Sequence, residues 1–440
     1  MTNTLTPMAA SARWHNWAGD QRCSPVAIER PRTREQLAEI VGAAAERGLT
    51  VRAHGSGHSF SDVALTDGVM VRCDRLDRVL SVDREAGLVK VEAGIVLADL
   101  NRKLDGFGLA FENLGDIDHQ TLAGSIATGT HGTGARLRSI SAQIEAVDMV
   151  LADGSSLEIS AGERPAELAA ARIGLGSLGL IYAATIRAVP AFTLDRLDSP
   201  RPLDDVLGRL DELNAGCDHF EFYVFPHTRT ALCRESRRTV GPPRPRSRAA
   251  VYAQEVMLEN WVGQAFALAG RHLPSQVPRL ARLAAAGTGR STKVDRSYRV
   301  FASERRIKFT EMEYGIPREH APEAVRRVLQ LVARPEHRVA YPIEVRFAAA
   351  DDVLLSAAHA RDVCYIAVHQ DRKLDWQPYF RGVEEIMDSY GGRPHWGKRH
   401  FQDAESLAPR YPRWREFLAV RDRLDPERRF ANVYTDRVLG

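Results

Sequence analysis

The 440-residue sequence contains few cysteines, and their spacing excludes two common kinds of site. The five cysteines are scattered along the chain, at Cys23, Cys73, Cys217, Cys233 and Cys364. Because no two of them form a C-x-x-C pair, the sequence indicates neither a zinc knuckle nor a disulfide framework, and no metal site is expected. Unpaired cysteines are usual in a reducing compartment, so we expect a cytoplasmic protein.

Long apolar runs and a large net charge are also missing. No stretch approaches the ~18 apolar residues that a membrane span needs, and residues 1–12 lack the pattern of a secretory signal. The 60 basic and 57 acidic side chains leave a net charge of +3, which argues against nucleic acid as a partner. With 44% apolar and 27% charged residues, the chain is typical of a globular protein, and its length predicts two domains.

Short strands mixed with helices are expected over residues 1–190. Thr33-Arg-Glu-Gln36 is typical of a capping box and predicts a helix that runs to about Arg47. Helical spacing recurs at 96–104, and strands are predicted at 49–53, 68–73, 87–92, 142–151 and 180–189. This mixture favours an α+β domain over a regular βαβ series.

A domain boundary is predicted near residue 190, where Pro190 and Pro200 bracket a polar stretch. The second domain, 191–395, is expected to contain helices at 262–286 and 379–390 and strands at 219–225, 339–348 and 362–369. The strand at 219–225 alternates as if one face were buried. The Arg- and Pro-rich segment Arg237–Arg248 favours an exposed loop, with a basic recognition arm as the alternative.

The segment from Arg52 to Ser61, RAHGSGHSFS, is the most informative of the chain. Its glycines let the backbone approach a ligand, and successive N–H groups can cradle a diphosphate. His58 stands where a ring nitrogen could touch that ligand. Phe60 occupies the place of the third glycine of the dinucleotide fingerprint, so a nicotinamide Rossmann site is disfavoured; a solvated loop is the other reading.

A second glycine-rich segment covers residues 108–134. Its small residues suit a planar cofactor edge that lies against the backbone, although a structural turn has the same composition. Gly174-Leu-Gly-Ser-Leu-Gly179 matches G-x-G-x-x-G by letter, but it follows a helical stretch and precedes a strand. The Rossmann fingerprint needs the opposite order, so no second dinucleotide site is predicted.

Candidate catalytic residues lie late in the chain. In Ile343-Glu-Val-Arg-Phe347 the alternation of a strand puts Glu344 and Arg346 on one face and apolar neighbours on the other. Such a pair can be a structural ion pair, but a carboxylate and a guanidinium also suit a polyol. His369 ends another strand and is a candidate base, while Lys398 follows a turn and offers a positive charge.

These motifs together resemble the aldonolactone oxidoreductases, flavoproteins of the vanillyl-alcohol oxidase type. The resemblance spans nearly the whole chain and rests on GSGHS at 55–59, AGSIATGTHGTG at 123–134, GSLGLI at 176–181, Glu-x-Arg at 344–346 and HWGK at 395–398. It implies a two-domain α+β fold in which residues 1–190, joined by 396–440, bind FAD. Residues 191–395 would form a cap, built on a mixed sheet, that holds the substrate.

The resemblance also implies roles for individual residues. In some members of the family the histidine that corresponds to His58 binds FAD covalently. The residues that would hold FAD here are Ala53, His54, Gly55, Ser56, Gly57, His58, Ser59, Gly115, Thr121, Ile126, Gly129, Thr130, His131, Gly132 and Ile181. Glu344 and Arg346 would grip the substrate, and Lys398 would face the N1–C2 edge of the flavin. His369 is the first candidate for the base and Glu344 the second.

The implied reaction is hydride transfer from the CH–OH group of a sugar-acid lactone, such as L-gulono-1,4-lactone, to flavin N5. An alditol oxidase is the alternative within the same chemistry, and a flavin-binding protein without turnover is the alternative from another class. By resemblance Gly115 lies beside the flavin C4a region, where a methyl group would hinder oxygen. We therefore expect O₂ to be permitted as electron acceptor, with another redox acceptor left open.

Overall fold

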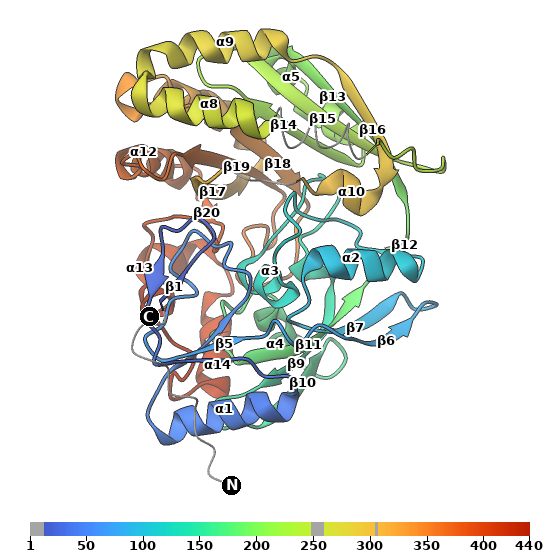
Figure 1. Cartoon of the computed structure of the whole chain (residues 1–440), viewed down its shortest axis with the longest axis vertical. Coiled ribbons are helices and arrows are strands. Elements are labelled where there is room, and N and C mark those ends of the chain that lie inside the picture. The colour runs from blue at the N-terminus through green and yellow to red at the C-terminus, as the bar shows by residue number, and fades with distance from the viewer. Residues whose placement is uncertain (1–12, 248–258, 304–306) are drawn as a thin grey trace.

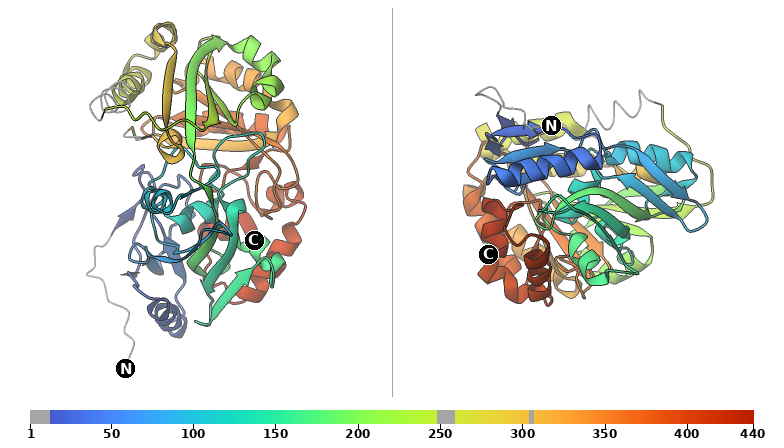
Figure 2. Two further views of the ribbon diagram at one scale, coloured as in Figure 1. Left: turned by 90° about the vertical axis from the view of Figure 1, so that its right-hand side faces the viewer. Right: turned by 90° about the horizontal axis from the view of Figure 1, so that it is seen from below.

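The computed structural model describes residues 13–247, 259–303 and 307–440, which form two regions stacked along the long axis of the molecule (Figure 1). The lower region combines strands from the first 190 residues with helices from the C-terminal end of the chain. The upper region is built on one large sheet. Figure 2 shows the same division from the side, with the C-terminus in the lower region.

The lower region contains two principal sheets. The larger is antiparallel, in the order β10-β9-β11-β7-β6, and comprises β6 (Val79–Asp83), β7 (Leu88–Glu92), β9 (Ile144–Val150), β10 (Ser156–Ser160) and β11 (Leu180–Arg187). The smaller is parallel, in the order β3-β5-β4, and comprises β3 (Ala27–Glu29), β4 (Val51–His54) and β5 (Val69–Arg72). Short pairs are formed by β1 (Trp14–His15) with β2 (Arg22–Cys23) and by β8 (Leu109–Ala110) with β12 (Val189–Pro190).

Helices from both ends of the sequence pack on these sheets. They are α1 (Arg34–Glu46), α2 (Leu97–Gly106), α3 (Leu122–Thr128), α4 (Pro165–Ala171), α13 (Ala404–Leu407), α14 (Trp414–Leu424) and α15 (Val433–Leu439). Phe417 of α14 and Tyr434 of α15 are completely buried in the hydrophobic core that also contains Val91 and Val147 of the larger sheet. The C-terminal helices therefore complete the core of the lower region.

The upper sheet has the strand order β16-β13-β15-β14-β18-β19-β17-β20. Its strands are β13 (Thr193–Pro202), β14 (His219–Val224), β15 (Thr230–Thr239), β16 (Ser291–Arg296), β17 (Thr310–Pro317), β18 (Ile343–Ala348), β19 (Val363–Gln370) and β20 (Arg393–Pro394). Each neighbouring pair is antiparallel, whereas a mixed sheet was expected, because residue alternation predicts strands but not the direction of their partners.

The two faces of the upper sheet differ in chemistry. Phe222, Val345 and Ile366 are neighbours on three adjacent strands and belong to an apolar core. That core also contains residues of α5 (Leu203–Gly208), α6 (Leu210–Ala215), α11 (Ala321–Val332) and α12 (Gln377–Asp388). The alternating positions carry polar side chains, namely His219, Glu221, Tyr223, Arg234, Ser236, Glu311, Glu313, Glu344, Arg346 and His369. This polar face turns toward the lower region.

Several sequence expectations were wrong in detail for the second half of the chain. All six residues of β14 are buried, because its polar face lies against the lower region rather than solvent. The helix expected at 262–286 is two helices, α8 (Glu259–His272) and α9 (Val277–Gly287), with Pro274 between them. The stretch between Pro190 and Pro200 is mostly part of β13.

The predicted start of the first helix was confirmed. Thr33 caps α1, and its side chain accepts a hydrogen bond from the Gln36 N–H. The segment Arg237–Arg248 was expected to be an exposed loop, but Arg237 and Arg238 are exposed residues of β15 and pair with β13. Arg248 lies outside the described residues. The helix α10 (Ser297–Phe301) was not anticipated. Among the described residues, no helix has both the length and the apolar character required to cross a bilayer.

Candidate functional site

A cleft lies between the loop that follows β4 and helix α3 in the lower region. Its space is about 930 Å³, including the part open to solvent. The structure brings nine of the residues named from the sequence to its wall: Ala53, His54, Gly55, Ser56, Gly57, His58, Ser59, Thr121 and Ile181.

The backbone of this loop leaves no room for side chains at its glycines. A Cβ at Gly55 would lie 2.4 Å from Oγ1 of Thr121, and Gly57 has a φ of +72°, which favours glycine. The loop and α3 therefore approach each other closely, and their exposed backbone can lie against a ligand such as a dinucleotide.

His54 is a buried polar group without a partner in the wall of the cleft. Only 6% of the residue is exposed, and neither ring nitrogen has a hydrogen-bond partner in the described part of the chain. Burial lowers the pKa of His54 to about 4, so the ring is neutral near pH 7. Unsatisfied buried polar atoms are rare in folded proteins, and a polar ligand in the cleft would supply the missing partner.

Arg52 begins the glycine-rich loop, but no role was predicted for it from the sequence. Its buried guanidinium donates hydrogen bonds to the carbonyls of Val63, Leu175, Gly176 and Phe430, at 2.5–3.1 Å. No carboxylate among the described residues forms an ion pair with it. Arg52 also lines the cleft, so it adds positive charge where a diphosphate would need it.

His58 stands between two aromatic rings at the rim of the cleft. Its ring stacks on Trp17, with centroids 5.6 Å apart, and lies parallel to that of His119 at 6.4 Å. Burial, and then electrostatic interactions with His119, Lys308 and Lys398, lower the pKa of His58 to about 4. The ring is therefore neutral near pH 7 and keeps a lone pair on one nitrogen.

The remaining cofactor candidates do not line this cleft; they are Gly115, Ile126, Gly129, Thr130, His131 and Gly132. Ile126 is fully buried in the hydrophobic core, and Gly129 ends α3 with a φ of +76°. A Cβ at Gly132 would lie 2.1 Å from the carbonyl oxygen of Leu114, so this segment also admits only a bare backbone. Gly132 lines a second cavity, which includes Arg346.

Arg346 lies among three carboxylates on the polar face of the upper sheet. Its Nε donates to Glu221 at 3.0 Å, one Nη lies 3.3 Å from Asp116, and the same nitrogen contacts Glu344. Burial alone would lower the pKa of Arg346, but these carboxylates raise it well above its usual range. The pair predicted from the sequence is therefore formed, within a larger buried network.

Three members of this network, Asp116, Glu221 and Tyr223, were not among the site residues predicted from the sequence. The hydroxyl of Tyr223 lies 3.0 Å from Glu344 and 3.2 Å from Glu221. Glu221 also accepts a hydrogen bond from Arg234 at 2.8 Å. The signal was present in the alternating polar residues His219, Glu221 and Tyr223, but the sequence does not show that this face is buried.

Lys398 and His369 both contact Glu311 of β17, which was not predicted to be a site residue. Lys398 Nζ lies 2.5 Å from one oxygen of Glu311 and His369 Nε2 lies 3.6 Å from the other. Burial would lower the pKa of Lys398, but Glu311 and Glu313 outweigh it and raise that pKa above its usual value. Nδ1 of His369 lies 3.3 Å from the carbonyl of Pro342, which can only accept.

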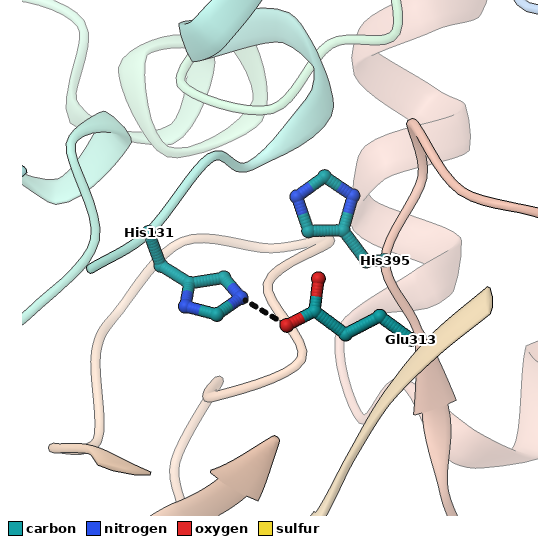
Figure 3. Close-up of side chains that lie close together, drawn as sticks. All are labelled: His131, Glu313 and His395. Atoms are coloured by element: carbon teal, nitrogen blue, oxygen red, sulfur yellow. Dashed lines mark ion pairs between the residues drawn. The ribbon is translucent and has the colours of Figure 1, made fainter. Parts of the chain in front are cut away.

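Behind these residues, His131, Glu313 and His395 form a buried trio (Figure 3). Nε2 of His131 lies 3.2 Å from Glu313. Burial raises the pKa of Glu313, but His131 and Lys398 outweigh that effect and hold it below its usual range. Nδ1 of His395 accepts a hydrogen bond from the Gly397 N–H at 3.0 Å, so Nε2 carries the ring hydrogen. In this tautomer His395 offers no lone pair to a metal, and the trio is an electrostatic cluster.

Comparison with known proteins identifies relatives along the whole chain. The family described as D-arabinono-1,4-lactone oxidase matches residues 184–438, and the FAD binding domain family matches residues 25–160. L-gulono-1,4-lactone dehydrogenase of Mycobacterium tuberculosis is 50% identical over 430 residues, which is 97% of this chain and 99% of the relative.

More distant relatives have related names. L-gulonolactone oxidase of Bos taurus is 34% identical, with 97% of this chain and 98% of the relative covered. Alditol oxidase of a Streptomyces species is 33% identical, with 96% and 98% covered. A solved structure of a solvent-stable cholesterol oxidase has a TM-score of 0.80 at 18% identity, with 96% of both chains covered, and shows that the two share a fold.

Proposed function

The chain belongs to the D-arabinono-1,4-lactone oxidase family, and we propose that its substrate is L-gulono-1,4-lactone or a closely related aldonolactone. It is an FAD-dependent oxidoreductase that acts on a CH–OH group. The structural observation that supports a shared site for substrate and cofactor is the contact between Asp116 and Arg346. It ties the substrate candidates of the upper sheet to the segment of the lower region that contains Gly115.

The residues of the cleft fit FAD. We propose that residues 53–59 with Thr121 and Ile181 hold the diphosphate part, and that Arg52 supplies positive charge there. Gly115, Ile126 and the segment Gly129–Gly132 would hold the flavin part. In this proposal residues 1–190 and 396–440 form the FAD-binding domain and residues 191–395 the cap.

Arg346 and Glu344 have the chemistry to orient a lactone. The guanidinium donates hydrogen bonds to ring and carbonyl oxygens, and the carboxylate accepts them from hydroxyl groups. Both are held by other buried groups, so they need little reorganisation when the substrate binds. An open sugar acid would bring an unpaired negative charge next to Glu344, Glu221 and Asp116, which favours the neutral lactone.

Oxidation of a CH–OH group requires a hydride acceptor and a base. FAD, when bound, supplies the hydride acceptor. We propose His369 as the base, because its Nδ1 faces the carbonyl of Pro342 and leaves Nε2 to take the hydroxyl proton. Glu311, 3.6 Å from Nε2, would then stabilise the protonated ring. Glu344 is the second candidate.

Lys398 provides the positive charge of the site. Because its pKa lies above the usual value for lysine, the side chain stays protonated over the working pH range. We propose that this charge faces the flavin N1–C2 edge, where it stabilises the negative charge that arrives with the hydride.

The experiment that tests this function is anaerobic reduction of the bound flavin, followed in its visible absorption band. L-gulono-1,4-lactone should bleach the flavin at low concentration, whereas xylitol and sorbitol should bleach it weakly. Bleaching by the alditols alone would instead identify an alditol oxidase, a candidate favoured by the 33% identity to that enzyme. No bleaching by any of them would indicate a flavin protein without this turnover.

The electron acceptor and the location in the cell are further parts of the proposal. Gly115 favours O₂ as an acceptor, with a protein or small redox acceptor as the alternative, and the rate at which air restores the bleached flavin measures this.

All five cysteines are free thiols, which supports a cytoplasmic location. Fractionation of the native cells with a disulfide-containing periplasmic marker tests it.

A further inference from the structure

A second cavity lies behind Arg346, on the side away from Lys398. It has about 370 Å³ of space, including the part open to solvent. Gly132 and Thr133 form its floor, strands β13, β14 and β15 form its roof, and α10 forms a side wall. Arg346 and Asp116 also line this cavity. A substrate bound by Arg346 would therefore lie next to its opening.

The charges around the cavity are already paired. Arg196 lies 3.3 Å from Asp198, and Arg234 lies 3.2 Å from Asp198 and 2.8 Å from Glu221. Arg346 is balanced by its own carboxylates. An anionic group that entered here would gain little attraction and would lose its hydration. Paired guanidinium and carboxylate groups can still exchange hydrogen bonds with neutral hydroxyl groups.

His219 adds an acceptor without a partner. Its Nδ1 lies 2.9 Å from the carbonyl oxygen of Thr133, which can only accept, so Nδ1 carries the hydrogen. Nε2 is therefore a lone pair, and it is buried with no hydrogen-bond partner in the described part of the chain. Burial lowers the pKa of His219 to about 4, so the ring remains an acceptor near pH 7. The neighbouring Ser236 is buried and lines the same cavity.

We infer that this cavity binds the exocyclic hydroxyl arm of the lactone, with His219 and Ser236 at its far end. The inference rests on the proposed function and extends it, because it assigns the recognition of arm length to residues that do not touch the reacting carbon. L-gulono-1,4-lactone has a two-carbon arm with two hydroxyl groups, whereas D-arabinono-1,4-lactone has a single hydroxymethyl group. The longer arm would reach the cavity and the shorter one would not.

The test compares two substitutions at Ser236 in the FAD-loaded enzyme. Ser236→Leu fills the cavity, and Ser236→Ala removes the same hydroxyl without filling it. In anaerobic flavin reduction, Ser236→Leu should raise the apparent dissociation constant of L-gulono-1,4-lactone about tenfold or more, the loss expected when a bound group is excluded. The constant for D-arabinono-1,4-lactone should change less than about twofold. Ser236→Ala removes one hydrogen-bonding hydroxyl but leaves the space open, so it should raise the constant for L-gulono-1,4-lactone by less than Ser236→Leu does.

A pair of substitutions at His219 gives a second test, which does not depend on filling the cavity with a larger side chain. His219→Asn can still donate to the Thr133 carbonyl but offers no acceptor at the Nε2 position, whereas His219→Gln can place an amide oxygen there. The first should weaken only the six-carbon lactone, and the second should restore its binding. The visible spectrum of the flavin and the melting temperature confirm that each variant is folded and loaded.

Equal losses for both lactones would overturn the inference, because they would show that the cavity acts through Arg346 rather than on the arm. Unchanged binding of both lactones in Ser236→Leu would also overturn it. These outcomes leave the proposed function intact, since both lactones would still bleach the wild-type flavin. If neither lactone bleaches the wild-type flavin, the proposed function fails, and this inference fails with it.

Discussion

Glu221 on β14 and Arg346 on β18 lie opposite each other across two paired strands, and the carboxylate accepts a hydrogen bond from the guanidinium Nε at 3.0 Å. The two residues are 125 positions apart in the sequence. This contact fixes the direction in which Arg346 presents its remaining N–H groups. Under the proposed function, Glu221 is therefore a positioning residue, which would act on the substrate through Arg346.

Replacing Glu221 by Gln should weaken substrate binding more than it slows the chemical step. The carboxamide can keep one hydrogen bond but loses the negative charge. This loss should raise KM by roughly tenfold, while kcat should change by no more than a few-fold. Steady-state kinetics with L-gulono-1,4-lactone measures both. Glu235→Gln is the matched control, because Glu235 is a buried, ion-paired residue of the same sheet that faces the other way. Equal effects of the two variants would contradict a positioning role.

Replacing Lys398 by Met should slow flavin reduction and lower the flavin midpoint potential. Loss of a preorganised charge at the developing anion corresponds to about 10²–10³-fold in rate, and each tenfold change in the two-electron equilibrium corresponds to about 30 mV. Stopped-flow reduction and a redox titration measure the two effects. Lys373→Met removes an exposed charge far along the chain from the motif of Lys398 and should change neither. A normal potential in Lys398→Met would exclude the proposed contact with the flavin.

His58→Gln tests whether FAD is covalently bound. The neutral ring of His58, with a pKa lowered to about 4 by burial and nearby charges, can act as a nucleophile near pH 7. We expect the flavin colour to stay with acid-precipitated wild-type protein and to be released from the variant. His119→Gln, which changes the adjacent parallel ring, should keep the colour. Complete release from the wild type would mean that His58 holds FAD without a bond.

Gly115→Ala tests the access of oxygen. The added Cβ would lie 3.2 Å from the carbonyl oxygen of His131 and 3.3 Å from a methyl carbon of Thr130, so it fits with a small shift. Reoxidation of the reduced flavin by air should slow by roughly tenfold, which is about 1.4 kcal/mol in the barrier, while reduction by the lactone is spared. Gly106→Ala, where nothing lies within 4 Å, is the control. Equal reoxidation rates would exclude a gate at this position.

Stability should fall as the pH drops below about 6.5, the ordinary pKa of histidine. Burial lowers the pKa of His400 to about 3 and that of His219 to about 4. Between these values and 6.5 the unfolded chain binds protons that the folded chain does not, so acid favours unfolding. Melting temperatures from pH 8 to pH 4 should show this decline, with a shallower slope for His400→Gln than for the exposed control His15→Gln. Parallel slopes would contradict the assignment.

Sequence patterns predicted individual helices and strands better than the tertiary contacts between them. The cap of α1 was predictable because Thr33 and Gln36 are local neighbours. α3 was missed, because glycine and threonine have low helix propensity and the helix depends on tertiary packing. Glu344 and Arg346 could be paired from strand alternation. Glu221 and Tyr223 join them through the pairing of β14 with β18, and Asp116 joins them through the packing of the lower region on the upper sheet. No local sequence pattern encodes either arrangement.

The hydrogen bonds of Arg52 have a consequence for biosynthesis. Arg52 lies beside the glycine loop, yet its donors reach the carbonyl of Phe430, and Asn432 donates to the carbonyls of Asp62, Val63 and Leu65. A growing chain that lacks its final segment therefore lacks the contacts that Phe430 and Asn432 make with the glycine loop and its neighbours. FAD capture should come at the very end of synthesis, and a short C-terminal truncation would act as a cofactor-binding defect.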